Sequence, residues 1–369
     1  MSATESVAEL SGAPRVEVGE TLLKVTDLKK HFPVKKPGII RLPDDPVKAV
    51  DGISLEVSRG QTVGLVGESG CGKSTAGRTM LRLLDPTSGT IEFAGQDITS
   101  VTGGDLQRLR REMQMVFQDP YGSLNPRHSV GEIVGAPFVI QKVKPPGGVK
   151  AAVQELMARV GLNPEHYNRY PHEFSGGQRQ RIGVARAIAL RPQLIVCDEP
   201  VSALDVSIQA QVVNLLEDIQ AEQQMAYIFI AHDLSVVRHI SDRVVVMYLG
   251  KIMENTDRDT LYESPRHPYT KALLSAVPVP DPAFTAKVER IRLQGDLPSP
   301  ANPPSGCVFR TRCWKAEEKC AAEVPPLVAL EPGHQVACHF PEPKADKVSF
   351  IPTIDDTVSA PPRDDTTAE

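Results

Sequence analysis

The stretch Gly67-Glu68-Ser69-Gly70-Cys71-Gly72-Lys73-Ser74-Thr75 decides the fold of this chain. It matches the pattern G-x-x-x-x-G-K-[ST], between an apolar strand predicted over 62–66 and a helix predicted over 73–84. Glycines let backbone N–H groups turn inward around phosphate oxygens, and the helix start directs its positive dipole end at the same anion. We expect all nine residues to bind a nucleoside triphosphate, with Lys73 at the β- and γ-phosphates and the Ser74 hydroxyl at Mg²⁺.

A second apolar strand, predicted over 194–198, ends in two carboxylates. Asp198 is expected to hold Mg²⁺ through water, and Glu199 is placed to polarise the water that attacks the phosphate. Alone, this segment is equally typical of a buried strand with a solvated acidic end. Its position after the phosphate-binding loop (P-loop, 67–75) favours the catalytic interpretation.

Together with five further motifs in matching order, these segments resemble the ATPase subunits of ABC transporters over about residues 22–253. The resemblance implies that Phe32 stacks on adenine, that Gln118 senses the γ-phosphate and Mg²⁺, and that His232 is the switch histidine. It also implies a signature motif and a D-loop, which are formed by Ser175, Gly176, Gly177 and Gln178 and by residues 202–205, ending in Asp205. Phe174, before the signature, stands where leucine is commoner in the family.

Three of these assignments have plainer alternatives. Phe32 alone is also typical of a core aromatic residue, Gln118 of a surface residue, and His232 of a structural histidine. His232 follows a strand predicted over 227–231, however, and α/β sheets bind ligands at the carboxyl ends of their strands. This position favours contact with the γ-phosphate.

The signature motif is itself an anion site, since it offers N–H groups and a hydroxyl at the start of a helix predicted over 178–190. In the resembled family this site faces the P-loop of a partner subunit, so that ATP lies between two chains. The sequence carries one P-loop and one signature motif. We therefore expect hydrolysis only in a dimer, with a related second ATPase subunit as the implied partner.

The expected fold class is α/β: a P-loop NTPase of the ABC type, with a RecA-like core, an antiparallel β subdomain and a helical subdomain over about 119–190. The whole ATPase domain is predicted over 21–262. A small Pro-rich, Cys-containing extension is predicted over 263–345. The polar tails, 1–20 and 346–369, are predicted to be disordered.

Composition limits where the chain works. A chain of 369 residues, 41% hydrophobic and 24% charged, suffices for one large domain with an appendage. The net charge of −5 gives no reason to expect a nucleic-acid partner. No apolar run reaches the roughly 20 residues of a membrane span, and the start lacks a secretory signal. We expect a cytosolic chain, held at the cytoplasmic face of the cell membrane by partners.

The segment after Ser264 resembles the C-terminal extension of oligopeptide and dipeptide importer ATPases. Residues 118–127 and 171–181 resemble the second of the two ATPase subunits of those importers. The resemblance implies peptide import with two membrane-spanning permease subunits and an extracytoplasmic substrate-binding protein. Nickel, glutathione and oligosaccharides remain open as cargo. A soluble ABC-type ATPase of DNA repair or translation is a further alternative, although the second nucleotide domain or coiled coil usual there is missing.

Six cysteines divide into two groups. Cys71 and Cys197 are expected to be unpaired core residues. A reducing compartment argues against disulfides among the other four cysteines. Zinc sites usually contain a closely spaced C-x₂₋₄-C pair, and the sequence has none. The resembled extension holds a [4Fe–4S] cluster, a role that would fall to Cys307, Cys313, Cys320 and Cys338. Zinc and unligated thiols remain alternatives. Because the P-loop is distant in the sequence, we expect ATP binding to be independent of these cysteines.

Overall fold

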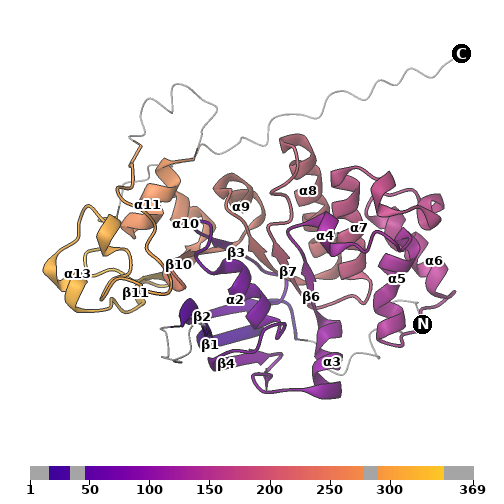
Figure 1. The fold of residues 1–369 in the computed structure, drawn as a ribbon, viewed down its shortest axis with the longest axis horizontal. Coiled ribbons are helices and arrows are strands. Elements are labelled where there is room, and N and C mark those ends of the chain that lie inside the picture. Colours follow the sequence, from indigo (N-terminus) through magenta and orange to yellow (C-terminus); the bar gives the residue numbers. More distant parts are fainter. Residues whose placement is uncertain (1–15, 34–45, 278–289, 345–369) are drawn as a thin grey trace, which may run out of the picture.

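The computed structural model of the chain describes residues 16–33, 46–277 and 290–344. Residues 1–15 of the predicted N-terminal tail and the whole predicted C-terminal tail lie outside the described residues. Two sheets organise the described part: an eight-stranded sheet and a separate four-stranded antiparallel sheet beside it (Figure 1). The predicted α/β class is confirmed.

The eight-stranded sheet holds the buried parallel core of the molecule. Its order is β11 (Val328–Glu331), β12 (His334–Val336), β10 (Lys251–Asp257), β9 (Arg243–Tyr248), β3 (Thr62–Val66), β8 (Ala226–Ile230), β7 (Leu194–Asp198) and β6 (Met113–Val116). From β9 to β6 all pairings are parallel. Every residue of β3, β7 and β8 is buried, as expected for parallel strands covered on both faces.

Side chains of these strands alternate between two hydrophobic clusters, one on each face of the sheet. On one face, Ile195 and Phe229 pack in the cluster that includes α8 (Val206–Gln223) and α9 (Leu234–Ile240). On the other face, Val196 and Ile228 pack in the cluster that includes α2 (Lys73–Met80) and the antiparallel sheet. Alternation of this kind follows from the two-residue repeat of a strand.

The four-stranded sheet has the order β2 (Val47–Ser58), β1 (Thr21–Phe32), β4 (Ser88–Phe93) and β5 (Gln96–Asp97). All its pairings are antiparallel, as predicted for the β subdomain. Helix α2 contacts β1 and β2 as well as β7 and β8. The helix that follows the P-loop is therefore clamped between the two sheets. From β5 the chain runs through α3 (Gly103–Glu112) to edge strand β6.

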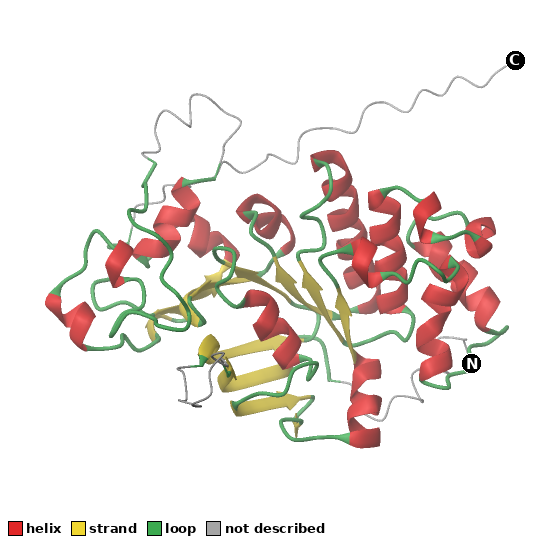
Figure 2. Cartoon of the chain, in the orientation of Figure 1, coloured by secondary structure: helices red, strands yellow, loops and turns green. Residues whose placement is uncertain are grey.

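A group of helices beyond β6 contains no strand between residues 119 and 190 (Figure 2). It comprises α4 (Pro120–Ser123), α5 (Val130–Ile140), α6 (Val149–Arg159), the 3₁₀ turns Pro164–Asn168 and Pro171–Glu173, and α7 (Gly176–Ile188). Helix α7 begins two residues before its predicted start because Ser175 and Gln178 form a capping box, in which each side chain accepts the other residue's N–H.

The C-terminal segment is joined to the core sheet, which the sequence did not indicate. It contains α10 (Arg258–Glu263), α11 (Pro268–Ser275), the 3₁₀ turn η3 (Arg310–Arg312), α13 (Glu318–Ala322) and the β11–β12 hairpin. Strand β12 pairs with β10. At this junction the buried Glu254 has its Oε1 atom 2.7 Å from His334 Nε2. Its carboxylate also accepts hydrogen bonds from the backbone N–H groups of Arg266 and His267. In the described ranges, no helix has both the length and the apolar character needed to cross a membrane.

Candidate functional site

The P-loop lies between β3 and α2, and neighbouring strands leave it no room for side chains at two points. Gly67 has φ 149° and Gly72 has φ 105°, values that L side chains rarely adopt. A Cβ at Gly67 would collide with the carbonyl oxygen of Met247, and a Cβ at Gly72 with that of Ala49. The predicted need for glycine thus has two causes, backbone conformation and close packing. The middle of the loop, at Ser69 and Gly70, is exposed and open to a ligand.

Lys73 folds back over the loop that precedes it. The side chain is buried, and its Nζ donates hydrogen bonds to the carbonyl oxygens of Gly67 at 2.7 Å and Glu68 at 3.0 Å. Two carbonyl dipoles therefore hold the ammonium charge beside the backbone N–H groups of the loop. A charge placed in this way suits the recognition of phosphate oxygens. The Cys71 thiol is buried, Thr75 is partly exposed, and the Thr75 carbonyl oxygen accepts the Thr79 hydroxyl at 2.7 Å.

Ser74 and Asp198 meet although 124 residues separate them in the sequence. The Ser74 hydroxyl donates to Asp198 Oδ1 at 2.5 Å, and the Arg78 guanidinium lies 3.3 Å from Asp198 Oδ2. Asp198 is fully buried at the end of β7. A hydroxyl and a carboxylate facing each other are the oxygen donors that Mg²⁺ prefers.

The Glu199 carboxylate contacts two other predicted site residues, Gln118 and His232. Its Oε2 accepts a hydrogen bond from Gln118 Nε2 at 2.9 Å and lies 3.3 Å from His232 Nδ1. The backbone of Glu199 has φ 45°, an unfavourable conformation for a residue with a side chain. Two contacts hold it there: its N–H donates to the Ile230 carbonyl at 2.9 Å, and its carbonyl accepts the Ser202 hydroxyl at 3.1 Å. The strained turn points one carboxylate at both Gln118 and His232.

Three predicted elements stand apart from this cluster. Phe32 ends β1 with 36% of its surface exposed, and the Lys30 ammonium lies 5.1 Å from the centre of its ring. Ser175 and Gln178 are exposed and hydrogen-bonded to each other. Asp205 is exposed at the start of α8, and its carboxylate makes no capping hydrogen bond to that helix. These groups are free to meet ligands or another chain.

The four cysteines of the C-terminal segment line one small cavity. Cys307, Cys313, Cys320 and Cys338 share it with the aromatic rings of Phe309 and Phe340. All four are free thiols, and burial raises the pKa of three of them, that of Cys338 to about 12. Within the described residues, however, no group of three or more His, Cys, Asp or Glu side chains is arranged to hold a metal ion. Cys71 and Cys197 are buried and unpaired, as predicted.

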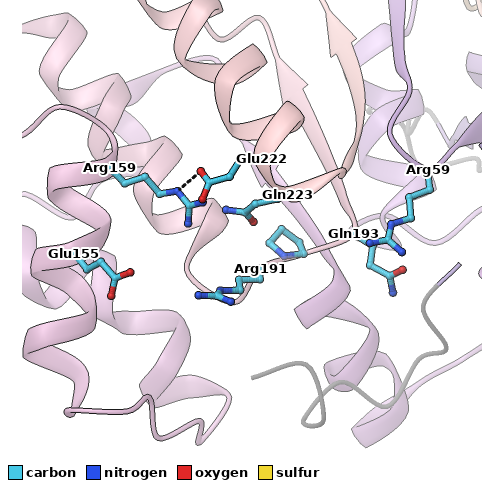
Figure 3. A pocket seen from close by; sticks show the side chains of 8 residues that line it. Arg59, Glu155, Arg159, Arg191, Gln193, Glu222 and Gln223 are labelled. Atoms are coloured by element: carbon cyan, nitrogen blue, oxygen red, sulfur yellow. Dashed lines mark hydrogen bonds and ion pairs between the residues drawn. The ribbon is translucent and has the colours of Figure 1, made fainter. Parts of the chain in front are cut away.

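A cavity of about 630 Å³ lies away from all these motifs (Figure 3). Its lining includes three arginines, of which Arg159 pairs with Glu222. Helix α6, the end of α8 and the turn before β7 supply most of its walls (Figure 3). No residue of the predicted nucleotide site lines it.

Comparison with known proteins agrees with this geometry. Residues 50–202 match the family model of the ABC transporter, and residues 253–320 match that of the oligopeptide/dipeptide transporter C-terminal region. The chain is 57% identical over 322 residues to the oligopeptide transport ATP-binding protein AppF of Bacillus subtilis, covering 87% of this chain and 98% of that one. It is 52% identical to a probable peptide ABC transporter ATP-binding protein of Sinorhizobium fredii, over 89% of this chain and 92% of the relative. The chain belongs to the ABC transporter ATPase family.

Solved ABC cassettes share the fold. The structure of cbiO1 from Clostridium perfringens superposes with a TM-score of 0.58 at 26% identity, over 66% of this ABC ATPase and 91% of the other chain. A dimeric post-hydrolysis structure of the cassette MJ0796, bound to ADP and phosphate, superposes with a TM-score of 0.57 at 25% identity, over 64% and 99%.

One contact in this ABC ATPase joins its two matched regions and was missed by sequence reasoning. The Glu68 carboxylate in the P-loop is ion-paired with Arg312, which directly precedes Cys313. The P-loop is therefore in direct contact with the cysteine-bearing segment, while our expectation that ATP binding is independent of the cysteines themselves stays a prediction. No local signal predicted this contact, because the partners lie 244 residues apart and each is an ordinary charged residue in its own segment.

Two glycine substitutions test the packing of the P-loop. Gly70 and Gly72 both have positive φ, but a Cβ at Gly70 meets nothing within 4 Å. Gly70→Ala should lower the free energy of unfolding by about 1–2 kcal/mol through backbone strain alone. Gly72→Ala should cost roughly 3 kcal/mol or more and abolish ATP binding, because the Ala49 carbonyl must also move. Chemical denaturation and nucleotide titration measure both; equal effects of the two variants would contradict the packing argument.

Proposed function

We propose that this ABC ATPase powers the import of oligopeptides or dipeptides across the cytoplasmic membrane. The proposed ATPase unit spans 21–262, with its helical subdomain at about 119–190 and the importer-type extension at 263–345. The observation that carries the ATPase assignment is the meeting of Gln118, Glu199 and His232 next to the Ser74–Asp198 pair. Peptide cargo is supported by the names of the relatives and by the match of the extension.

The geometry supports a separate role for each of these residues at the γ-phosphate. Backbone N–H groups of the P-loop, apart from that of Glu68, which donates to Tyr269, and the Lys73 ammonium bind the phosphates, and Phe32 stacks on adenine. Ser74, Gln118 and Asp198 would hold Mg²⁺, which when bound would supply positive charge beside the phosphate oxygens. Glu199 orients a water molecule, whose oxygen attacks the γ-phosphorus while the bond to the bridging oxygen of ADP breaks. His232, which lies beside the same Glu199 oxygen as Gln118, stabilises the γ-phosphate.

A second chain is needed to complete the site. Ser175, Gly176, Gly177 and Gln178 are proposed to bind the γ-phosphate of ATP held by a partner's P-loop, with Asp205 at the same interface. Their exposure at the start of α7 supports this role, since the N–H groups at a helix start attract anions. We propose a related ATPase subunit as the partner, forming a hetero-dimer.

Membrane attachment is proposed to come from other subunits. Two permease subunits would hold the dimer at the cytoplasmic face of the membrane, and an extracytoplasmic binding protein would deliver the cargo. Tyr121, which follows Gln118 in the segment that contacts permeases in the resembled family, is 66% exposed and stacked under the Arg179 guanidinium at 4.0 Å. Its rigid, exposed ring is suited to docking.

Glu199→Gln tests catalysis and cargo together. In the purified assembly ATP should still bind, while turnover falls at least about 100-fold because the water loses its carboxylate partner. Cells that carry the variant should lose uptake of a labelled tripeptide. Unchanged hydrolysis, measured with the partner's site disabled, would remove Glu199 from the mechanism.

The same variant tests the cargo. If cells lose uptake of nickel, glutathione or an oligosaccharide but keep peptide uptake, the cargo assignment changes to that substrate. If cells show no transport phenotype, a soluble ABC ATPase is favoured.

The shared site is tested at Gly176 rather than at Gly177, whose Cβ would collide with Ile208 of the same chain. A Cβ at Gly176 makes only ordinary contact with Leu204. Gly176→Asp places a carboxylate where the partner's γ-phosphate is proposed to bind, so hydrolysis at the partner's P-loop should fall at least about tenfold by like-charge repulsion. Gly176→Ala is the matched control and should stay active. ATP binding at this chain's own P-loop should survive in both, and its selective loss would contradict the sandwich.

We further propose that Cys307, Cys313, Cys320 and Cys338 hold a [4Fe–4S] cluster, with zinc as the alternative. The residue type and the shared cavity support this proposal, because four thiols line one cavity and four thiolates are the usual ligands of such a cluster. Held there, the group would cross-link a segment that is rich in proline and poor in regular structure.

Anaerobically purified protein should be brown and contain about four irons per chain. Replacing any one of the four cysteines by serine should lower the iron content and expose residues 290–340 to proteolysis, whereas Cys197→Ser is a control outside the cavity. Colourless protein with stoichiometric zinc would establish the alternative. Protein that contains neither metal after anaerobic purification would end both versions.

A further inference from the structure

Glu68 is a P-loop residue that contacts the C-terminal segment, and its carboxylate, N–H and carbonyl groups all have partners in the described structure. We propose that Arg312 and Tyr269 are positioning residues that fix the P-loop through Glu68, so that ATP affinity depends on the C-terminal segment. The proposal rests on ATP binding at residues 67–75, as set out under the proposed function.

The carboxylate of Glu68 forms a bidentate ion pair with the guanidinium of Arg312. Arg312 Nη1 donates a hydrogen bond to Glu68 Oε2 at 2.6 Å, and Arg312 Nη2 donates one to Glu68 Oε1 at 3.1 Å. The side chain of Arg312 is only 10% exposed and that of Glu68 is 26% exposed. Partial burial and the parallel geometry make this pair stronger and more directional than an ordinary surface ion pair.

The backbone of Glu68 is held on both sides of its Cα. Its N–H donates to the hydroxyl oxygen of Tyr269 at 2.9 Å, so this amide has its hydrogen-bond partner within the protein. Its carbonyl oxygen accepts a hydrogen bond from Lys73 Nζ at 3.0 Å. A shift of Glu68 therefore moves one of the two carbonyls that place the Lys73 ammonium, the charge proposed to bind the phosphates.

Arg312 and Tyr269 are themselves fixed by an aromatic cluster. Phe309, in the turn that leads to Arg312, has its ring centre 5.2 Å from that of Tyr269 and 5.3 Å from that of Tyr248. All three rings are buried. Tyr248 ends β9, directly after Met247, whose carbonyl faces Gly67. The contact with Glu68 is thus braced against the core strand that also shapes the P-loop.

This arrangement predicts an effect on binding rather than on chemistry. Both guanidinium prongs are used on Glu68, and neither Arg312 nor Tyr269 contacts the Ser74–Asp198 pair or the Glu199 cluster in the described structure. Loosening Glu68 should weaken the preorganisation of the P-loop, which costs affinity. Once ATP has bound, the water-activating groups are unchanged, and kcat at saturating ATP should be preserved.

The test compares Arg312→Gln with Arg310→Gln in the full assembly. Arg310 lies in the same 3₁₀ turn but donates to the Ser305 carbonyl and hydroxyl instead of Glu68, which makes it a matched control. Titration with a fluorescent ATP analogue should show about fivefold or greater weakening for Arg312→Gln, the scale of typical site-to-site coupling, and less than about twofold for Arg310→Gln. Steady-state kinetics should show a raised KM with kcat within about twofold.

A double-variant cycle shows whether the effect passes through the ion pair. Glu68→Gln should weaken ATP binding to a similar degree, and Glu68→Gln with Arg312→Gln should be no worse than either alone. Additive losses, a reduced kcat with unchanged affinity, or unchanged affinity in Arg312→Gln would each overturn the proposal. If Arg312→Gln does not fold, Glu68→Gln and Arg312→Lys give the same readout, with Lys recovering the charge but not the fork. Failure of the wild-type assembly to bind ATP would refute the proposed function itself.

Discussion

The packing of two carbonyl oxygens against the P-loop is the constraint on which the rest of the structure depends. The carbonyl of Met247 comes from β9 in the core sheet, and that of Ala49 comes from β2 in the antiparallel sheet. Because both approach positions where a Cβ would collide, the loop keeps its shape only while both sheets stay in place. Helix α2, which contacts strands of both sheets, sets their separation. The antiparallel sheet is therefore part of the phosphate site and not only a cover for the core.

Two adjacent carboxylates at the end of β7 have different surroundings, which suit them to the different roles proposed for them. Asp198 is fully buried, and a hydroxyl and a guanidinium offset the cost of burying its charge. Glu199 is half-buried after a strained turn, with only Gln118 and His232 at its Oε2. Strain of this kind persists only where neighbours impose it, and it is common at catalytic sites. The turn separates the residue suited to a metal from the residue suited to a water molecule.

The sequence predicted the structural features that depend on contiguous residues. It did not predict the contacts between residues that lie far apart in the chain. Residues of the P-loop, the paired carboxylates and the buried strands follow from local pattern, and the structure places them as expected. Hairpin β11–β12 escaped notice because its strands are only four and three residues long, too short for a recognisable alternation, and β12 pairs with β10 far away in the chain. The Glu68–Arg312 pair escaped for a similar reason: a charge reveals its partner only after the chain has folded.

The four-cysteine cavity lies in a segment that is anchored to the catalytic core at several places, two of which lie beside β9. One anchor is the pairing of β12 with β10, closed by the buried Glu254–His334 contact. The other is the ion pair between Arg312 and Glu68. Because both anchors flank β9, the segment cannot swing away as a rigid body without breaking one of them. The stretch 307–313 begins and ends with a cysteine of the cavity and also carries Arg312, which is ion-paired with Glu68, so a short piece of chain joins the cavity to the P-loop.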